Sequence, residues 1–76
     1  MKILYYSAAV KLKEKIKCVI GMQVLTTKEE VTIEQMECLY RFMVERYFGH
    51  VRVMAFGQTD KESFELKTNI TITAKY

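Results

Sequence analysis

Residues 31–49, VTIEQMECLYRFMVERYFG, form the one stretch of this 76-residue chain with a sustained helical period. At about 100° per residue, its apolar side chains gather on one face. This pattern predicts a helix whose apolar stripe packs on a sheet supplied by the flanking sequence. The stripe comprises Ile33, Met36, Tyr40, Met43, Val44 and Tyr47.

Two capping boxes compete to begin this helix. Thr32 with Gln35 forms one, and Thr27 with Glu30 forms another about one turn earlier. The residues on either side of Thr32 are β-branched and disfavour a helix interior, which favours Thr32 as the cap. Gly49 suits the position just past the helix end.

The flanking sequence is typical of strands. Residues 2–12 (KILYYSAAVKL) and 15–26 (KIKCVIGMQVLT) predict two strands joined by a turn at 13–15, with one long bulged strand as the alternative. Residues 51–56 (VRVMAF) predict a third strand, and residues 57–61 (GQTDK) predict a turn. Residues 62–76 alternate apolar and polar side chains and predict a fourth strand.

These elements predict one small α+β domain spanning residues 1–76. Its sheet would have four antiparallel strands in β-β-α-β-β order, with the helix at about 32–48 on one face. A chain this short buries only about 60% of the surface that it exposes when unfolded, so self-association would be a useful supplement.

Charge is unevenly spread along the chain. Residues 1–28 hold six lysines and one glutamate, whereas residues 29–48 hold five glutamates and two arginines. Such a polarity can steer partners or pair subunits.

The two cysteines, Cys18 and Cys38, lack the spacing of a metal or redox motif, and His50 is the single histidine. We therefore expect no metal or other cofactor. We expect free thiols in a cytoplasmic protein, with a disulfide between the two in a secreted protein as the alternative. No run approaches the roughly 18 apolar residues of a membrane span, and the N-terminal residues do not resemble a signal peptide, so we expect no membrane partner.

Cys38 and Phe42 fall on the back of the predicted helix, where a solvated helix needs neither. This pair predicts contact with a partner protein or with a second copy in a homodimer. The alternatives are a more deeply buried helix, or a Phe42 ring lying along the stem of Arg46.

Four lysines, Lys11, Lys13, Lys15 and Lys17, would share one face of an extended chain, about 6.6 Å apart. They could bind an acidic protein or a nucleic-acid backbone. The alternative is an edge strand protected by lysines against pairing, and a turn at Glu14 would divide the set between two strands.

A third surface is the sheet face opposite the predicted core. It would present exposed apolar side chains next to Arg52 and Lys67. A register slip of one residue would bury them instead. The apolar members are Val19, Leu25, Met54 and Phe56.

We expect no enzyme activity. The pairs of Glu34 with Glu37 or Glu45 would be solvated helix surface, His50 would lie about 15 Å or more from Cys38, and Cys18 is assigned to the core face. The sequence predicts a protein-binding module, a regulator or inhibitor of the kind made by phages and mobile elements, that occupies a partner's surface. The alternatives are a nucleic-acid-binding protein that uses the lysine-rich N-terminal hairpin, and a small subunit of a larger assembly.

Overall fold

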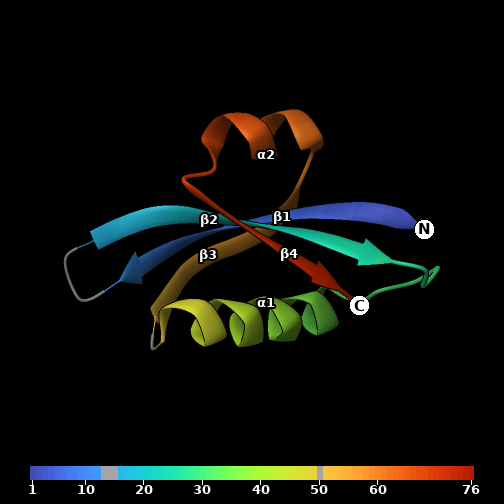
Figure 1. The fold of residues 1–76 in the computed structure, drawn as a ribbon, viewed down its shortest axis with the longest axis horizontal. Coiled ribbons are helices and arrows are strands. Elements are labelled where there is room, and N and C mark those ends of the chain that lie inside the picture. The colour runs from blue at the N-terminus through green and yellow to red at the C-terminus, as the bar shows by residue number, and fades with distance from the viewer. Residues whose placement is uncertain (13–15, 50) are drawn as a thin grey trace.

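A computed structural model describes residues 1–12, 16–49 and 51–76 of the chain (Figure 1). Its four strands form one sheet in the order β3-β1-β2-β4, and a helix lies on each face. The elements in chain order are β1 (Lys2–Leu12), β2 (Ile16–Thr26), α1 (Ile33–Phe48), β3 (Val51–Thr59), α2 (Lys61–Lys67) and β4 (Ile70–Lys75).

The predicted small α+β fold is confirmed, but two of its details are wrong. β1 pairs with β2 and with β3 in antiparallel fashion, whereas β4 pairs with β2 in parallel, so the sheet is mixed. A second helix, α2, interrupts the predicted β-β-α-β-β order. The antiparallel β1–β2 pairing excludes a single long strand, and the predicted turn at 13–15 lies outside the described residues.

Helix α1 begins where the sequence predicts, at the Thr32 capping box. The Gln35 N–H donates to Thr32 Oγ1 at 3.1 Å, and the Thr32 N–H donates to Gln35 Oε1 at 3.2 Å. At the other end Gly49 adopts a φ of 74°, which favours glycine, and its N–H donates to the Glu45 carbonyl at 2.8 Å.

The core lies between α1 and the sheet. Met36, Tyr40 and Val44 are buried against the inward-facing side chains of the two central strands, Tyr6, Ala8 and Val10 of β1 and Ile20, Met22 and Val24 of β2. Ile33 and Tyr47, which were predicted to join this stripe, are instead 54% and 62% exposed. Both lie in the terminal turns of α1, so only its central turns reach the buried core.

Tyr40 ties α1 to the centre of the sheet. Its hydroxyl donates to the carbonyl oxygen of Ile20 in β2, and its ring meets Phe56 of β3 edge-on with centroids 5.0 Å apart. Burial raises the pKa of Tyr40 well above its usual value. The phenol therefore stays protonated, and remains a hydrogen-bond donor, to a higher pH than an exposed tyrosine does.

The prediction of a strand over residues 62–76 is wrong for its first half. Asp60 caps α2 by accepting a hydrogen bond from the Ser63 N–H at 2.7 Å, and this bond lowers the pKa of the Asp60 carboxyl. Phe64 is buried while Leu66 is 76% exposed. Residues two positions apart, such as Phe64 and Leu66, lie on the same face of a strand. On a helix they lie about 200° apart, which explains why only one of them is buried.

The predicted turn at 57–61 is also wrong, because β3 continues through Thr59. Gly57 and Gln58 pair with Ser7 and Tyr6 of β1. An extra residue, Met54, interrupts this pairing as a β-bulge, since Ala55 is opposite Ala9 and Val53 is opposite Val10.

The direction of the strands accounts for helices on both faces. Since β1 is antiparallel to both β2 and β3, the strands β2, β3 and β4 all run the same way. The connection through α1 crosses the sheet from β2 to β3, and the connection through α2 crosses back from β3 to β4. A connection between two parallel strands of one sheet is right-handed. Because the two connections cross the sheet in opposite directions, both can be right-handed only if α1 and α2 lie on opposite faces.

Helix α2 is held by a small second core on its own face of the sheet. The Phe64 ring lies against Tyr5 of β1, with centroids 5.0 Å apart. It also lies over Gly21 of β2, where an added Cβ would be 2.5 Å from the Phe64 ring and 2.8 Å from Thr68. The absence of a side chain at Gly21 therefore makes room for α2.

We predict that Gly21→Ala displaces α2 and destabilises the fold by about 1–3 kcal/mol, because the new methyl group overlaps Phe64 and Thr68. Urea unfolding measures the loss, and hydrogen exchange over residues 61–67 reports the position of α2. Gly57→Ala is the matched control, because a Cβ at Gly57 meets no atom within 4 Å. Equal stability of the Gly21→Ala variant and the parent would show that this contact does not position α2.

We also predict that Thr32→Ala lowers the free energy of unfolding by about 1 kcal/mol, because the Gln35 N–H loses its acceptor. Thr27→Ala removes the competing cap and should change stability by less than about 0.5 kcal/mol, as an exposed substitution without such a contact does. Thermal unfolding of both variants decides which threonine caps the helix in solution.

Candidate functional site

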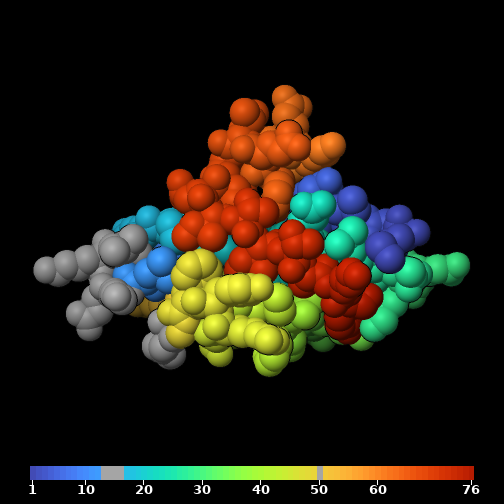
Figure 2. All heavy atoms as spheres, in the orientation of Figure 1, coloured from blue at the N-terminus to red at the C-terminus, as the bar shows by residue number. Residues whose placement is uncertain are grey.

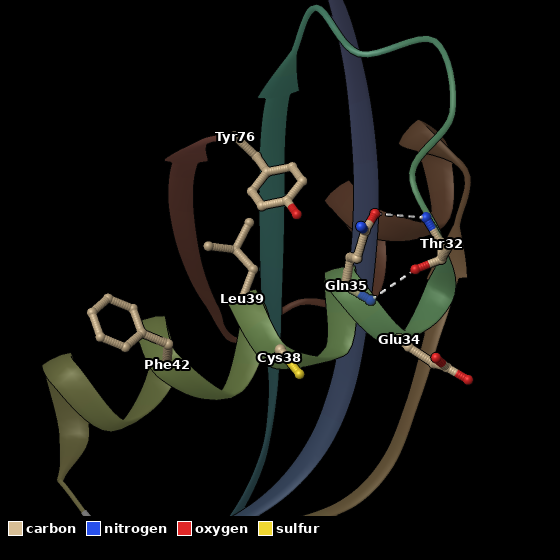
Figure 3. A pocket seen from close by; sticks show the side chains of 7 residues that line it. All are labelled: Thr32, Glu34, Gln35, Cys38, Leu39, Phe42 and Tyr76. Carbon is tan, nitrogen blue, oxygen red and sulfur yellow. Dashed lines mark hydrogen bonds between the residues drawn. The ribbon is translucent and has the colours of Figure 1, made fainter.

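The back of α1 carries Cys38 and Phe42 on the surface, as the sequence predicts. Cys38 is exposed, and the Phe42 side chain is 61% exposed. The alternative of a more deeply buried helix is thus wrong at these two positions. Both residues line a single open groove along the side of α1 (Figure 3).

This groove has a volume of about 620 Å³ and lies between α1 and the end of β4. Leu39 points toward the ring of Tyr76, and Phe42 projects at the end of the groove nearest the helix C-terminus (Figure 3). The other end is the Thr32–Gln35 capping box, and Glu34 points away from Tyr76. The groove therefore has an apolar middle and polar groups at one end.

Tyr76 was not predicted to belong to this surface. Its N–H donates to the Leu25 carbonyl of β2 at 2.9 Å, which extends the β4 pairing by one residue. Lys28 places Nζ 3.7 Å from the centroid of the Tyr76 ring, a cation–π contact. These two contacts hold the ring beside the groove. No local pattern reveals them, because they join residues far apart in sequence.

Charged contacts are few among the described residues. Among the described residues, the one salt bridge joins Glu37 to Arg41, at 2.7 Å on the exposed surface of α1. The described part of the chain also contains no cluster of three side chains that could hold a metal ion. Leu39, Phe42 and Tyr76 supply apolar contact area with a thiol beside it, an arrangement suited to packing against a side chain of another molecule.

The structure divides the predicted set of four lysines between two strands. Lys11 in β1 is directly opposite Lys17 in β2, and Lys13 and Lys15 lie outside the described residues. Lys11 also pairs with Arg52 of β3. Because β1 has neighbours on both sides, Lys11 does not protect an edge strand.

The third predicted surface is only partly formed. Val19 and Leu25 are half-buried on the face that carries α2. Phe56 instead packs on the core face, where its ring stacks on Tyr6 with centroids 5.4 Å apart. Met54 is exposed at the bulge of β3. The bulge shifts the strand by one residue, which is why the simple alternation assigned Phe56 to the wrong face.

Both thiols are free, so the alternative of a Cys18–Cys38 disulfide is wrong. Cys18 is half-buried and packs against the core, whereas Cys38 faces solvent. Neither helix among the described residues is long and apolar enough to cross a membrane. The predicted separation of His50 from the cysteines concerns a residue outside the described part of the chain.

We predict that a maleimide reagent modifies Cys38 first and Cys18 more slowly, because the core shields Cys18. Mass spectrometry of peptides after a brief exposure measures the two rates. Denaturant should make the rates similar. Equal rates under native conditions would contradict the packing of Cys18.

Comparison with protein-family models found no match for the chain, and comparisons with curated proteins and with solved structures found none either.

Proposed function

We propose that the chain is a non-enzymatic protein-binding module, a small regulator or inhibitor that acts by occupying the surface of a partner protein. The contact surface is the α1 groove, formed by Leu39, Phe42 and Tyr76 with Cys38 at its side. The observation that carries this proposal is Phe42, a large apolar side chain that is 61% exposed at the end of a groove.

Burial of Phe42 by a partner would remove much apolar surface from water. Fully burying a phenylalanine side chain contributes about 1.5–3 kcal/mol. Aromatic residues next to apolar hollows are common sources of binding energy at protein interfaces. Since α1 keeps its fold through Met36, Tyr40 and Val44 on the other side, Phe42 is available for such a contact.

The free edge of β4 lies beside this groove and also suits a protein partner. The Tyr76 N–H points to β2, and backbone groups alternate along a strand, so those of Thr71, Thr73 and Lys75 point away from the sheet. β4 pairs with β2 without a shift in register, whereas the opposite edge strand, β3, is interrupted by the Met54 bulge. Bulges protect edges from pairing, so β4 is the more accessible edge.

Phe42→Glu tests the proposal, with Tyr47→Glu as its matched control. Tyr47 lies on the same helix and is 62% exposed, but it does not line the groove. Both variants should unfold within about 0.5 kcal/mol of the parent, because both side chains are exposed. We expect proteins that bind the parent and Tyr47→Glu to be lost with Phe42→Glu.

The measurement is an affinity pull-down from cells that naturally make the chain, treated with nuclease and quantified by mass spectrometry. Light scattering of the purified variants reports whether the partner is a second copy of the chain. If Phe42→Glu keeps both the parent's mass in solution and its set of bound proteins, the α1 groove is not the binding surface.

A further inference from the structure

A row of three cations crosses the sheet on the face that carries α2. Lys11 of β1 is directly opposite Lys17 of β2 on one side and Arg52 of β3 on the other. Residues directly opposite one another in a sheet project to the same side, so the three charges lie next to each other. Lys17 and Arg52 are exposed, and Lys11 is half-buried.

This row is unfavourable for the fold alone, because like charges directly opposite one another destabilise a strand pair. The four strands contain no Asp or Glu, and the one salt bridge among the described residues is on α1. An anionic ligand would relieve the repulsion.

Short side chains border the row among the described residues. The next residues on the same face of the three strands are Ala9, Val19 and Ala55, and Ala9 is directly opposite each of the other two. Gly57 lies beyond them on β3, with open space at its Cβ position. Helix α2 lies over the middle of the sheet, away from the ends of β1 and β2 that carry Lys11 and Lys17 (Figure 1). A ligand backbone can therefore approach the row over these short aliphatic side chains and the open space at Gly57.

We propose that this cation row, Lys11, Lys17 and Arg52, binds the phosphate backbone of nucleic acid without reading its sequence. Three charges on adjacent strands span about 10 Å. A nucleic-acid strand presents a phosphate about every 3.4 Å along its axis, so the row spans about three phosphate-to-phosphate intervals and each cation can reach a phosphate. The surface beside the row offers no exposed aromatic ring, within the described residues, on which a base could stack.

The cation row and the α1 groove are on opposite faces of the sheet, so they form two separate binding sites. Figure 2 looks at the molecule from the side of the β4 edge, with α1 below the sheet and α2 above it. Phe42→Glu should therefore leave nucleic-acid binding unchanged. Substitutions in the row should leave the proteins bound at the groove unchanged.

The test is fluorescence anisotropy of the full chain with a labelled mixed-sequence single strand and with its duplex, over a salt titration that begins at low ionic strength. Three phosphate contacts predict a log–log salt slope of about −2.7 on duplex DNA and about −2.1 on a single strand. Lys17→Ala should reduce the duplex slope by about 0.9 in magnitude, because one contact is lost.

Lys17→Glu separates binding from stability. It should weaken binding more than about tenfold, by removing a phosphate contact and adding a repulsive charge. It should also raise or maintain the melting temperature, because Glu opposite Lys11 replaces a like-charge pair with an attractive one. Lys61→Glu, at the start of α2, makes the same change in net charge and should keep the parent's salt slope.

Three results would overturn the proposal. The first is no detectable binding to either oligonucleotide at low salt, and the second is a Lys17→Glu variant that binds as tightly as the parent. The third is binding of poly-glutamate as tight as that of the oligonucleotides, which would assign the row to an acidic protein.

Discussion

Burial of the Met36, Tyr40 and Val44 stripe against the centre of the sheet is the contact on which the rest of the structure depends. It covers the face of β1 and β2 that holds most of the core. It is directional as well as apolar, because the Tyr40 hydroxyl donates to the Ile20 carbonyl of β2. Once this stripe is buried, the rotation of α1 about its axis is set, and Cys38 and Phe42 must face outward.

The two faces of the sheet differ in chemistry. The α1 face holds a large apolar core, whereas α2 covers its face through little more than Phe64, Tyr5 and Gly21. The four strands carry lysines and an arginine but no Asp or Glu. Three of the five glutamates of residues 29–48 lie instead on α1. The apolar groove and the cation row are thus separated by the thickness of the sheet. A molecule bound at one of these two surfaces would not cover the other.

Local chemistry made part of the fold predictable from sequence. The Thr32–Gln35 capping box requires only residues three apart, and the i, i+4 stripe of α1 requires only one helix. The error over residues 62–76 has an equally local origin. Phe64 and Leu66 continue the alternation of β4 by coincidence, while the helix signal was an Asp60 cap followed by a short run of helix-forming residues. A seven-residue helix is too short to show a clear period of its own.

The candidate sites were predictable to different degrees. The exposure of Cys38 and Phe42 followed from the helical period, because the opposite side of α1 had to enter the core. The participation of Tyr76 did not, because its position depends on pairing with β2 and on Lys28. The grouping of Arg52 with Lys11 and Lys17 likewise depends on the order of strands in the sheet.

The sequence by itself determined the caps and the buried stripe of α1, the strands β1 and β2, and the excess of positive charge near the N-terminus. Only the tertiary structure decided the parallel entry of β4, the position of α2 on the second face and the groove beside Tyr76. The physical reason is the distance along the sequence between the residues that interact. Caps and periods arise from neighbours within one or two turns, whereas strand order and surface grooves depend on which distant segments bury their apolar faces together.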